Sequence, residues 1–285
     1  MDNRKLRPHA RCALLLLLCL LSVAGVARGQ QSQSLARPLK FTDEAVALPY
    51  AFRRSTPGDP YLTKLRTSYE LDGVVAGKRS DYDKVRAVSR WVRSRWEHNG
   101  DNEPRKADPI SILQEAAEGK RFRCVEYSIV VAAALNSIGV PARVLALKTE
   151  DVETRESGAG HVVAEAYLTD ARKWIMVDGQ WDVIPTLKGR PLNAVELQDA
   201  LARRAKGLSV ESFSGAKADE YFKWVAPYLF YFDVRFDSRY EVERQPHSLM
   251  LVPVGAKEPA IFQKKWPLKN MIYTRSRLAF YAKPA

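Results

Sequence analysis

One helix-length segment, residues 125–137, has almost no polar surface, and this constrains the fold more than any other feature. Its apolar residues occupy all sides of a helix rather than one stripe: Val125, Ile129, Val130, Ala132, Ala133, Ala134 and Leu135. A helix that is apolar all round must be surrounded by other elements. Gly139 and Pro141 end the pattern. We therefore expect a buried central helix from about Val125 to Ser137.

Three segments after this helix have the composition of strands, being rich in β-branched and aromatic residues. They are residues 142–147, 161–168 and 173–179, and Thr169–Arg172 is the expected turn between the last two. Helices are expected elsewhere in the chain. A helix capped by Ser80 carries Val85, Val88, Val92 and Trp96 on one side, a short helix from Asp108-Pro109 reaches about Glu118, and further helical segments are residues 61–71 and 193–206.

The first 29 residues have the pattern of a secretory signal peptide. Four basic residues precede the almost wholly apolar segment Ala13–Ala27, and Ala27-Arg28-Gly29 offers small residues for cleavage before Gln30. The apolar run is short for a membrane span, although an uncleaved N-terminal anchor is the alternative reading. We expect an exported protein, periplasmic or extracellular, with no stable membrane span after cleavage.

Charge and cysteine content narrow the possible functions. Removing residues 1–29 takes away five Lys/Arg and one Asp, so the net charge falls from +12 to +8. A basic exported protein is drawn towards anionic surfaces such as envelope polymers. The sequence has neither zinc-finger spacing nor an RNP-type aromatic motif, so we expect no nucleic-acid partner. Cys12 and Cys19 leave with the signal peptide, so Cys124 stays without a disulfide partner.

Cys124 stands at the expected N-terminus of the buried helix, where unpaired N–H groups and the helix dipole favour an anion. Arg121 and Arg123 add positive charge nearby. Thiol catalysis needs a thiolate, a base, and a group that orients the base. An inert core cysteine is the alternative for such a position.

Among the histidines that remain after residue 29, His161 opens a predicted strand, whereas His98 and His247 lie in irregular segments. If the turn centres on Asp170-Ala171, Val163 faces Asp178, and Asp178 becomes the diagonal neighbour of His161 on one face of the sheet. Such neighbours lie roughly 7–8 Å apart between Cα atoms.

The pairing of His161 with Asp178 depends on the register, because a slip of one residue places the two on opposite faces. Asp170 or Asp182 could take the place of Asp178. Glu165 shares the face of His161, and an ordinary structural pairing is the favoured role for it.

The segments RFRCVEYSIVVAAALNSIGVPARVLAL, GHVVAEAYL and KWIMVDGQWD resemble the transglutaminase-like core, a branch of the papain-like superfamily, over about residues 80–185. The resemblance implies a nucleophilic Cys124, a base His161 and an orienting Asp178. It also implies an oxyanion helper upstream of the cysteine, for which Trp96 is the candidate, with core packing as the alternative. Animal crosslinking enzymes have Gly-Gln before the cysteine and Trp after it, whereas this chain has Arg123 and Val125.

We therefore predict an α+β fold, a papain-like, transglutaminase-like core with its nucleophile helix packed on an antiparallel sheet. The predicted parts are a signal peptide (1–29), an N-terminal lead-in (30–79), a catalytic core (80–190) and a C-terminal extension packed on it (191–285).

The predicted activity is acyl transfer or hydrolysis at peptide or carboxamide carbonyls, with hydrolysis favoured. The expected partner is a protein or peptide substrate or a cell-envelope polymer. No metal or other cofactor is expected, because the sequence has no zinc-site spacing and no acidic cluster that suggests calcium dependence. The alternative is a non-catalytic module that binds a peptide or envelope polymer in the same groove. An aromatic-rich segment, residues 221–240, could line a groove for a polymeric substrate, although core packing is the favoured role for it.

Overall fold

A computed structural model describes residues 35–284, which belong to one compact unit. The predicted signal peptide lies outside the described residues. Within them, no helix combines the length and the apolar character that crossing a membrane requires.

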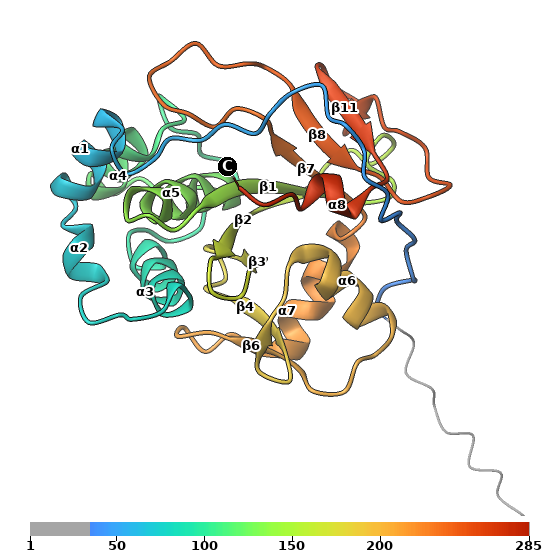
Figure 1. Cartoon of the computed structure of the whole chain (residues 1–285), viewed down its shortest axis with the longest axis horizontal. Coiled ribbons are helices and arrows are strands. Elements are labelled where there is room, and N and C mark those ends of the chain that lie inside the picture. The colour runs from blue at the N-terminus through green and yellow to red at the C-terminus, as the bar shows by residue number, and fades with distance from the viewer. Residues whose placement is uncertain (1–34, 285) are drawn as a thin grey trace, which may run out of the picture. The chain divides into compact units, whose positions relative to one another are not determined.

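The N-terminal half supplies a group of helices around the predicted central helix (Figure 1). These are α1 (Pro60–Ser68), α2 (Leu71–Val74), α3 (Asp81–Arg93), α4 (Pro109–Ala117) and α5 (Cys124–Ser137). Both predicted caps are confirmed, because Ser80 Oγ accepts from Asp83 N–H at 3.0 Å and Asp108 Oδ1 accepts from Ser111 N–H at 3.0 Å. Each bond satisfies a first-turn N–H that has no partner within its helix.

A six-stranded sheet has the strand order β11-β8-β7-β1-β2-β3. Its members are β1 (Ala142–Lys148), β2 (Gly160–Leu168), β3 (Lys173–Val177), β7 (Tyr231–Arg235), β8 (Ser248–Leu251) and β11 (Met271–Thr274). All neighbours are antiparallel except β11 and β8, which are parallel. The predicted α+β fold with a largely antiparallel sheet is confirmed. Strands from the C-terminal third of the chain thus share one sheet with β1–β3.

The remaining elements are short. A three-stranded sheet has the order β5-β4-β6, and β9 pairs with β10 in a hairpin. Their bounds are β4 (Ile184–Leu187), β5 (Arg190–Pro191), β6 (Leu208–Glu211), β9 (Ile261–Phe262) and β10 (Trp266–Pro267). The helical elements are α6 (Ala194–Ala202), α7 (Ala218–Val225), the 3-10 turn η1 (Ala226–Tyr228) and α8 (Arg277–Phe280).

Apolar side chains cover both faces of the central strands. Ala164, Ala166 and Val177 join the core formed with α1–α5, whereas Val163 and Met176 join the core formed with α6 and α7. This alternation follows from the period of two along a strand. The residues that share the parity of Val163 and Met176, His161 and Asp178 among them, therefore lie on the face that α6 and α7 cover.

The predicted register of β2 and β3 is confirmed. Ala164 pairs with Val177 and Ala166 with Ile175, the pairing obtained when the turn centres on Asp170-Ala171. The third strand ends earlier than predicted, at Val177 rather than Gly179. The reason is a tight return of the chain, because Asp178 and Val183 exchange backbone hydrogen bonds of 2.9 and 3.0 Å.

Candidate active site

Cys124 is the first residue of α5, one position before the predicted start of this helix. Its side chain is partly exposed, whereas most of the helix that follows is buried. N–H groups in the first turn of a helix have no partner within the helix and create a positive potential. The sulfur therefore lies where an anion is favoured and where a substrate can reach it.

Arg123 adds positive charge near the sulfur, as expected, but this charge is paired with carboxylates. The Arg123 guanidinium donates to Glu126 Oε1 at 2.8 Å and also pairs with Glu103. Glu126 in turn accepts from Arg123 N–H at 3.1 Å. Two carboxylates thus neutralise this arginine, and the stabilisation of an anion at the helix start rests on the backbone and on the histidine described next.

His161 and Asp178 form a buried pair. Their Nε2 and Oδ2 atoms are 2.7 Å apart, and the side chains are 2% and 0% exposed. A carboxylate only accepts, so Nε2 carries the proton and Nδ1 is the ring nitrogen left for Cys124. Cys124 contributes to the electrostatic environment of the same imidazole.

The environment of His161 favours its charged form. Burial alone disfavours the imidazolium, but the charge and hydrogen bond of Asp178, with a further contribution from Cys124, outweigh it and raise the pKa of His161 to about 10. The imidazolium is therefore the stable form at neutral pH. A thiolate on Cys124 would add to the stabilisation of this charged form.

Both carboxylate oxygens of Asp178 accept hydrogen bonds. Its Oδ1 accepts from the N–H groups of Gln180 and Trp181, each at 3.1 Å. Its Oδ2 accepts from Tyr221 Oη at 3.0 Å as well as from His161. A carboxylate with all these partners cannot turn away from the histidine.

The other acidic candidates lie elsewhere. Asp182 accepts from the N–H groups of Phe213 and Ser214 at 2.8 Å, and Asp170 is exposed in its turn. Glu165 makes the structural pairing that was favoured for it, with Arg143 Nη2 at 2.7 Å.

Ser128 ties the nucleophile helix to the histidine strand. Its Oγ lies 2.8 Å from Val162 O on β2 and 2.9 Å from Cys124 O one turn earlier on α5. Val162 follows His161 directly in the chain. One fully buried hydroxyl therefore bridges the two backbone segments that carry the sulfur and the imidazole.

Two aromatic residues of α7 and one of the 3-10 turn η1 contribute to this site, and the sequence did not single them out. Tyr221 reaches Asp178, and the rings of Trp224 and Tyr228 lie 4.6 and 5.9 Å from that of His161. Trp224 and Tyr228 are partly exposed, so they form a rim beside the catalytic candidates, while Tyr221 is buried. The available signal was the spacing of Tyr221 and Trp224, since residues three apart lie on one face of a helix.

Trp96 and His98 lie upstream of the cysteine. Trp96 is 6% exposed, packs against Phe122 and Tyr127, and its Nε1 has no hydrogen-bond partner among residues 35–284. His98 forms a backbone bridge with Phe122. Burial and the charge of His161 lower the pKa of His98, which places this second histidine beside the site as a neutral group.

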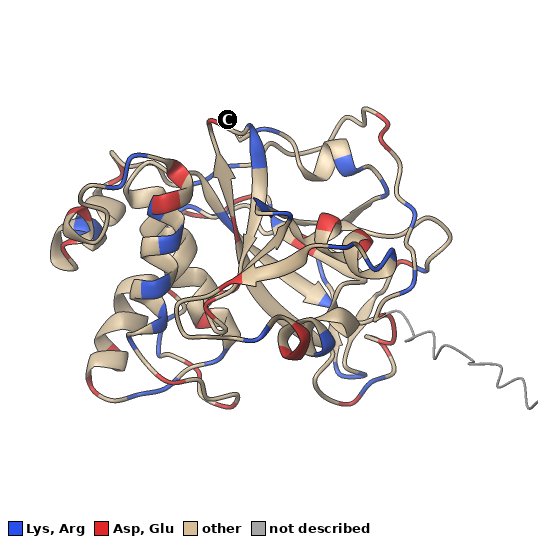
Figure 2. Ribbon diagram, turned by 90° about the horizontal axis from the view of Figure 1, so that it is seen from below, with Lys and Arg blue, Asp and Glu red and all other residues tan. Residues whose placement is uncertain are grey.

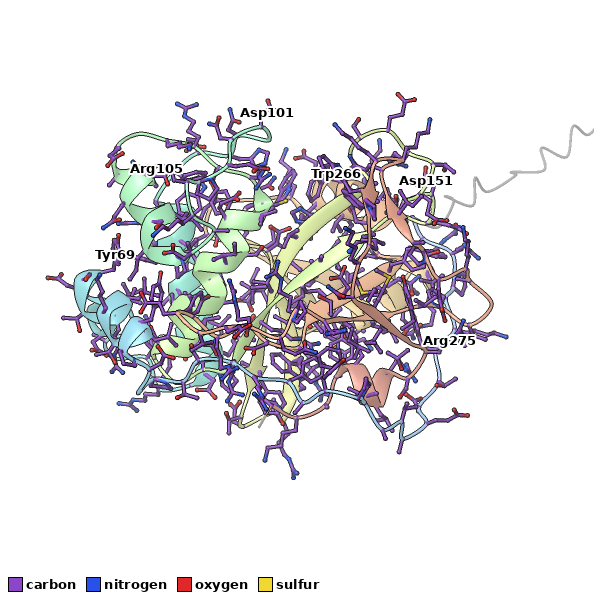
Figure 3. The ribbon with its side chains drawn as sticks, turned by 90° about the horizontal axis from the view of Figure 1, so that it is seen from above. Tyr69, Asp101, Arg105, Asp151, Trp266 and Arg275 are labelled. Atoms are coloured by element: carbon purple, nitrogen blue, oxygen red, sulfur yellow. The ribbon has the colours of Figure 1, made fainter. Side chains whose placement is uncertain are left out.

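A hairpin supports the loop that leads into His161. Val152 O in this loop accepts from Gln263 N–H at 2.7 Å, and Ala159 N–H donates to Gln263 Oε1 at 3.1 Å. Figure 3 shows the two segments side by side at Asp151 and Trp266. The loop and the hairpin together hold the start of β2.

The distribution of charged residues bears on whether the described part of the chain could hold a metal ion. Figure 2 shows basic and acidic residues spread over most elements. Among residues 35–284, no three metal-ligating side chains come together in a way that could hold an ion.

A family model described as the Transglutaminase-like superfamily matches residues 71–179. This segment contains Cys124, His161 and Asp178 in the order helix, strand, end of the next strand. Residues 71–179 belong to the transglutaminase-like superfamily. Tyr221, Trp224 and Tyr228 lie beyond the matched transglutaminase-like segment.

Solved structures similar to this chain include a provisionally assigned cysteine protease from Cytophaga hutchinsonii, with 15% identity and a TM-score of 0.35, covering 56% of this chain and 49% of the other. A TGase has 24% identity and a TM-score of 0.29, covering 41% and 30%. LapG of Legionella pneumophila has 13% identity and a TM-score of 0.34, covering 62% and 96%. The chain thus spans half or less of the first two. No curated protein matches it in sequence.

Proposed function

We propose that this protein is an exported thiol enzyme that transfers the acyl group of a peptide or carboxamide, with water as the favoured acceptor. The observation that carries the proposal is the buried hydrogen bond of 2.7 Å between His161 and Asp178, with Cys124 also acting on the same imidazole. A nucleophile, a base and an orienting group in contact are the minimum for this chemistry.

In the proposed reaction the Cys124 thiolate attacks the carbonyl carbon, and the carbonyl electrons move to oxygen. The Cys124 N–H at the start of α5 and the Trp96 Nε1 are the proposed donors to this oxyanion. Trp96 is suited to the role because its buried indole N–H has no hydrogen-bond partner among residues 35–284. Donors already in place lower the barrier because they need no reorganisation as the charge develops.

Collapse of this intermediate breaks the C–N bond. His161 gives its Nδ1 proton to the departing amine or ammonia and leaves a thioester on Cys124. The neutral imidazole then takes a proton from water, whose oxygen attacks the thioester, and finally the acid product leaves and the thiolate returns. Asp178 keeps the ring in the required orientation and stabilises its charged form throughout.

Water is favoured over an amine as the acceptor because Arg123 and Val125 replace the flanking residues of crosslinking enzymes. The partly exposed rings of Trp224 and Tyr228 suit a peptide or other polymer that lies across the site, since aromatic rings give large contact areas. The proposal that the protein is exported depends on the signal-peptide pattern of residues 1–29. Expression in a bacterium followed by N-terminal sequencing of the exported protein should show Gln30 as the first residue.

Labelling with a panel of acyl probes tests the enzymatic proposal. We expect one adduct on Cys124 in the wild type and none in Cys124→Ser. Equal labelling of the two proteins, or none in either, would favour a binding module without catalysis. A glutamine-containing peptide with and without a primary amine then separates the acceptors, because hydrolysis gives ammonia or a cleaved peptide and transfer gives an amine adduct.

A further inference from the structure

Tyr221 contacts the proposed catalytic groups from outside the matched superfamily segment. It lies on α7, 43 residues after Asp178 in the chain, and its hydroxyl is 3.0 Å from Asp178 Oδ2. The same oxygen accepts from His161 Nε2 at 2.7 Å. Asp178 and Tyr221 are both 0% exposed, so water cannot replace this hydroxyl without a rearrangement.

The direction of the Tyr221 hydrogen bond is fixed by its chemistry. An ionised carboxylate offers no proton, so the tyrosine donates. Burial, followed by the charge of Asp178, raises the pKa of Tyr221 well above its usual value. The hydroxyl therefore remains a donor throughout the working pH range.

Two separate parts of the chain hold the two carboxylate oxygens of Asp178 in place. The N–H groups of Gln180 and Trp181 fix Oδ1 from within the local turn. Nothing in this turn fixes Oδ2, and Tyr221 supplies the second donor there. One helical turn later, Trp224 packs edge-on against His161, with an interplanar angle of 77°.

We propose that Tyr221 is a positioning residue, which aims Asp178 Oδ2 at His161 and tempers the carboxylate charge, so that the C-terminal region completes the active site. The proposal rests on the proposed function for its effect on turnover. Its effect on the histidine stands apart from turnover, because the hydrogen bond changes the electrostatics of the pair whether or not a substrate reacts.

The test is Tyr221→Phe, which keeps the ring and removes only the hydroxyl. Without this donor, more negative charge remains on Asp178, the imidazolium is stabilised further, and the titration of His161 moves to higher pH. The turnover number kcat should fall roughly tenfold with KM nearly unchanged, which corresponds to a loss of about 1.4 kcal/mol of transition-state stabilisation.

Tyr281→Phe is the matched control. Its hydroxyl also donates to a buried carboxylate, Glu165 Oε1, at 3.0 Å, but Glu165 pairs with Arg143 instead of the histidine. Loss of stability without a change at His161 is expected for this control. An equal response of both variants would mean that Tyr221 acts through folding alone.

NMR titration of His161, assigned with His161→Gln, and steady-state turnover of an acyl substrate give independent readouts. A moved titration in Tyr221→Phe supports the positioning role, even if the wild type turns over no acyl substrate and the proposed function fails. An unmoved titration with unchanged kcat in an active enzyme overturns the role of Tyr221 and leaves the proposed function intact.

Discussion

Gly179 lies so close to Val131 of the nucleophile helix that a Cβ at this position would be 2.9 Å from Val131 Cγ2. The same Cβ would be 3.3 Å from Tyr127 Cβ. The residue after Asp178 therefore packs directly against α5, which begins with Cys124. Because Gly179 has no side chain, the turn that carries Asp178 can pack this closely against the helix that carries Cys124.

Gly179→Ala should displace Asp178 from His161, because either the turn or α5 must shift to relieve the clash. We expect a melting temperature several degrees lower, since overpacking a core costs about 1–3 kcal/mol, and a clear loss of turnover. Thermal unfolding and acyl-substrate kinetics measure the two effects, and adding Val131→Ala should restore part of the activity.

Gly73→Ala is the control for this substitution. An added Cβ there meets nothing within 4 Å, and the residue lies in α2. Alanine favours a helix over glycine by about 0.5–1 kcal/mol, so this variant should be as stable as the wild type or more so. If Gly179→Ala and Gly73→Ala had the same stability and the same turnover, the close packing of Gly179 against α5 would not explain the effect.

Ser128→Ala should weaken the link between α5 and β2 beside His161. We expect a stability loss of about 1 kcal/mol from the hydrogen bond and a several-fold lower turnover, because the sulfur and the imidazole become less well aligned. Ser137→Ala removes a similar buried bond, to Ala134 O at 2.7 Å, at the far end of the same helix. Comparable activity losses in the two variants would contradict a specific role for Ser128.

Asp178→Asn should change the pH dependence of activity. In the wild type, the raised pKa of His161 keeps the ring charged until the pH approaches about 10, so activity should decline only above this range. Without the carboxylate, burial lowers the pKa, and the decline should move to near or below pH 6.5, with kcat reduced roughly 10³–10⁴-fold. Asp182→Asn, which leaves the His161 pair intact, should keep the wild-type profile. An unmoved profile in Asp178→Asn would exclude Asp178 as the orienting group.

The same raised pKa links stability to pH. A group with a higher pKa in the folded than in the unfolded state stabilises the fold fully below its unfolded value, about 6.5, and the stabilisation is lost as pH rises through the folded value. The difference in unfolding free energy between wild type and His161→Gln should therefore shrink between pH 6 and pH 10. Urea unfolding at several pH values measures it, and a difference that grows with pH would contradict the assigned charge.

Local signals in the sequence predicted the parts of the site that are close together in the chain. The cap at Ser80, the burial of α5 and the register of β2 with β3 depend on neighbouring residues or on one short turn, and the structure agrees with each. The ion pair between Arg123 and Glu126 could also have been predicted, because Glu126 follows three residues later on the same helix.

Contacts between distant segments could not be predicted in this way. The pairing of β1 with β7 and the hydrogen bond from Tyr221 to Asp178 join residues far apart in the sequence. The aromatic segment around α7 was compatible with a core or with a groove, and the structure gives both, since Tyr221 is buried and Trp224 is partly exposed. Which of these rings is buried and which borders the site depends on how the whole chain packs.

Alkylation of Cys124 by iodoacetamide across pH tests the central claim most directly, in a chain carrying Cys12→Ser and Cys19→Ser so that one thiol reports. If Cys124 is a thiolate paired with the His161 imidazolium, it should react faster than a free thiol below pH 7, and His161→Ala should abolish this advantage. A free thiol reacts mainly near its pKa of about 8.5 and above. A wild-type curve of that form, unchanged by His161→Ala, would contradict the proposed catalytic role of Cys124.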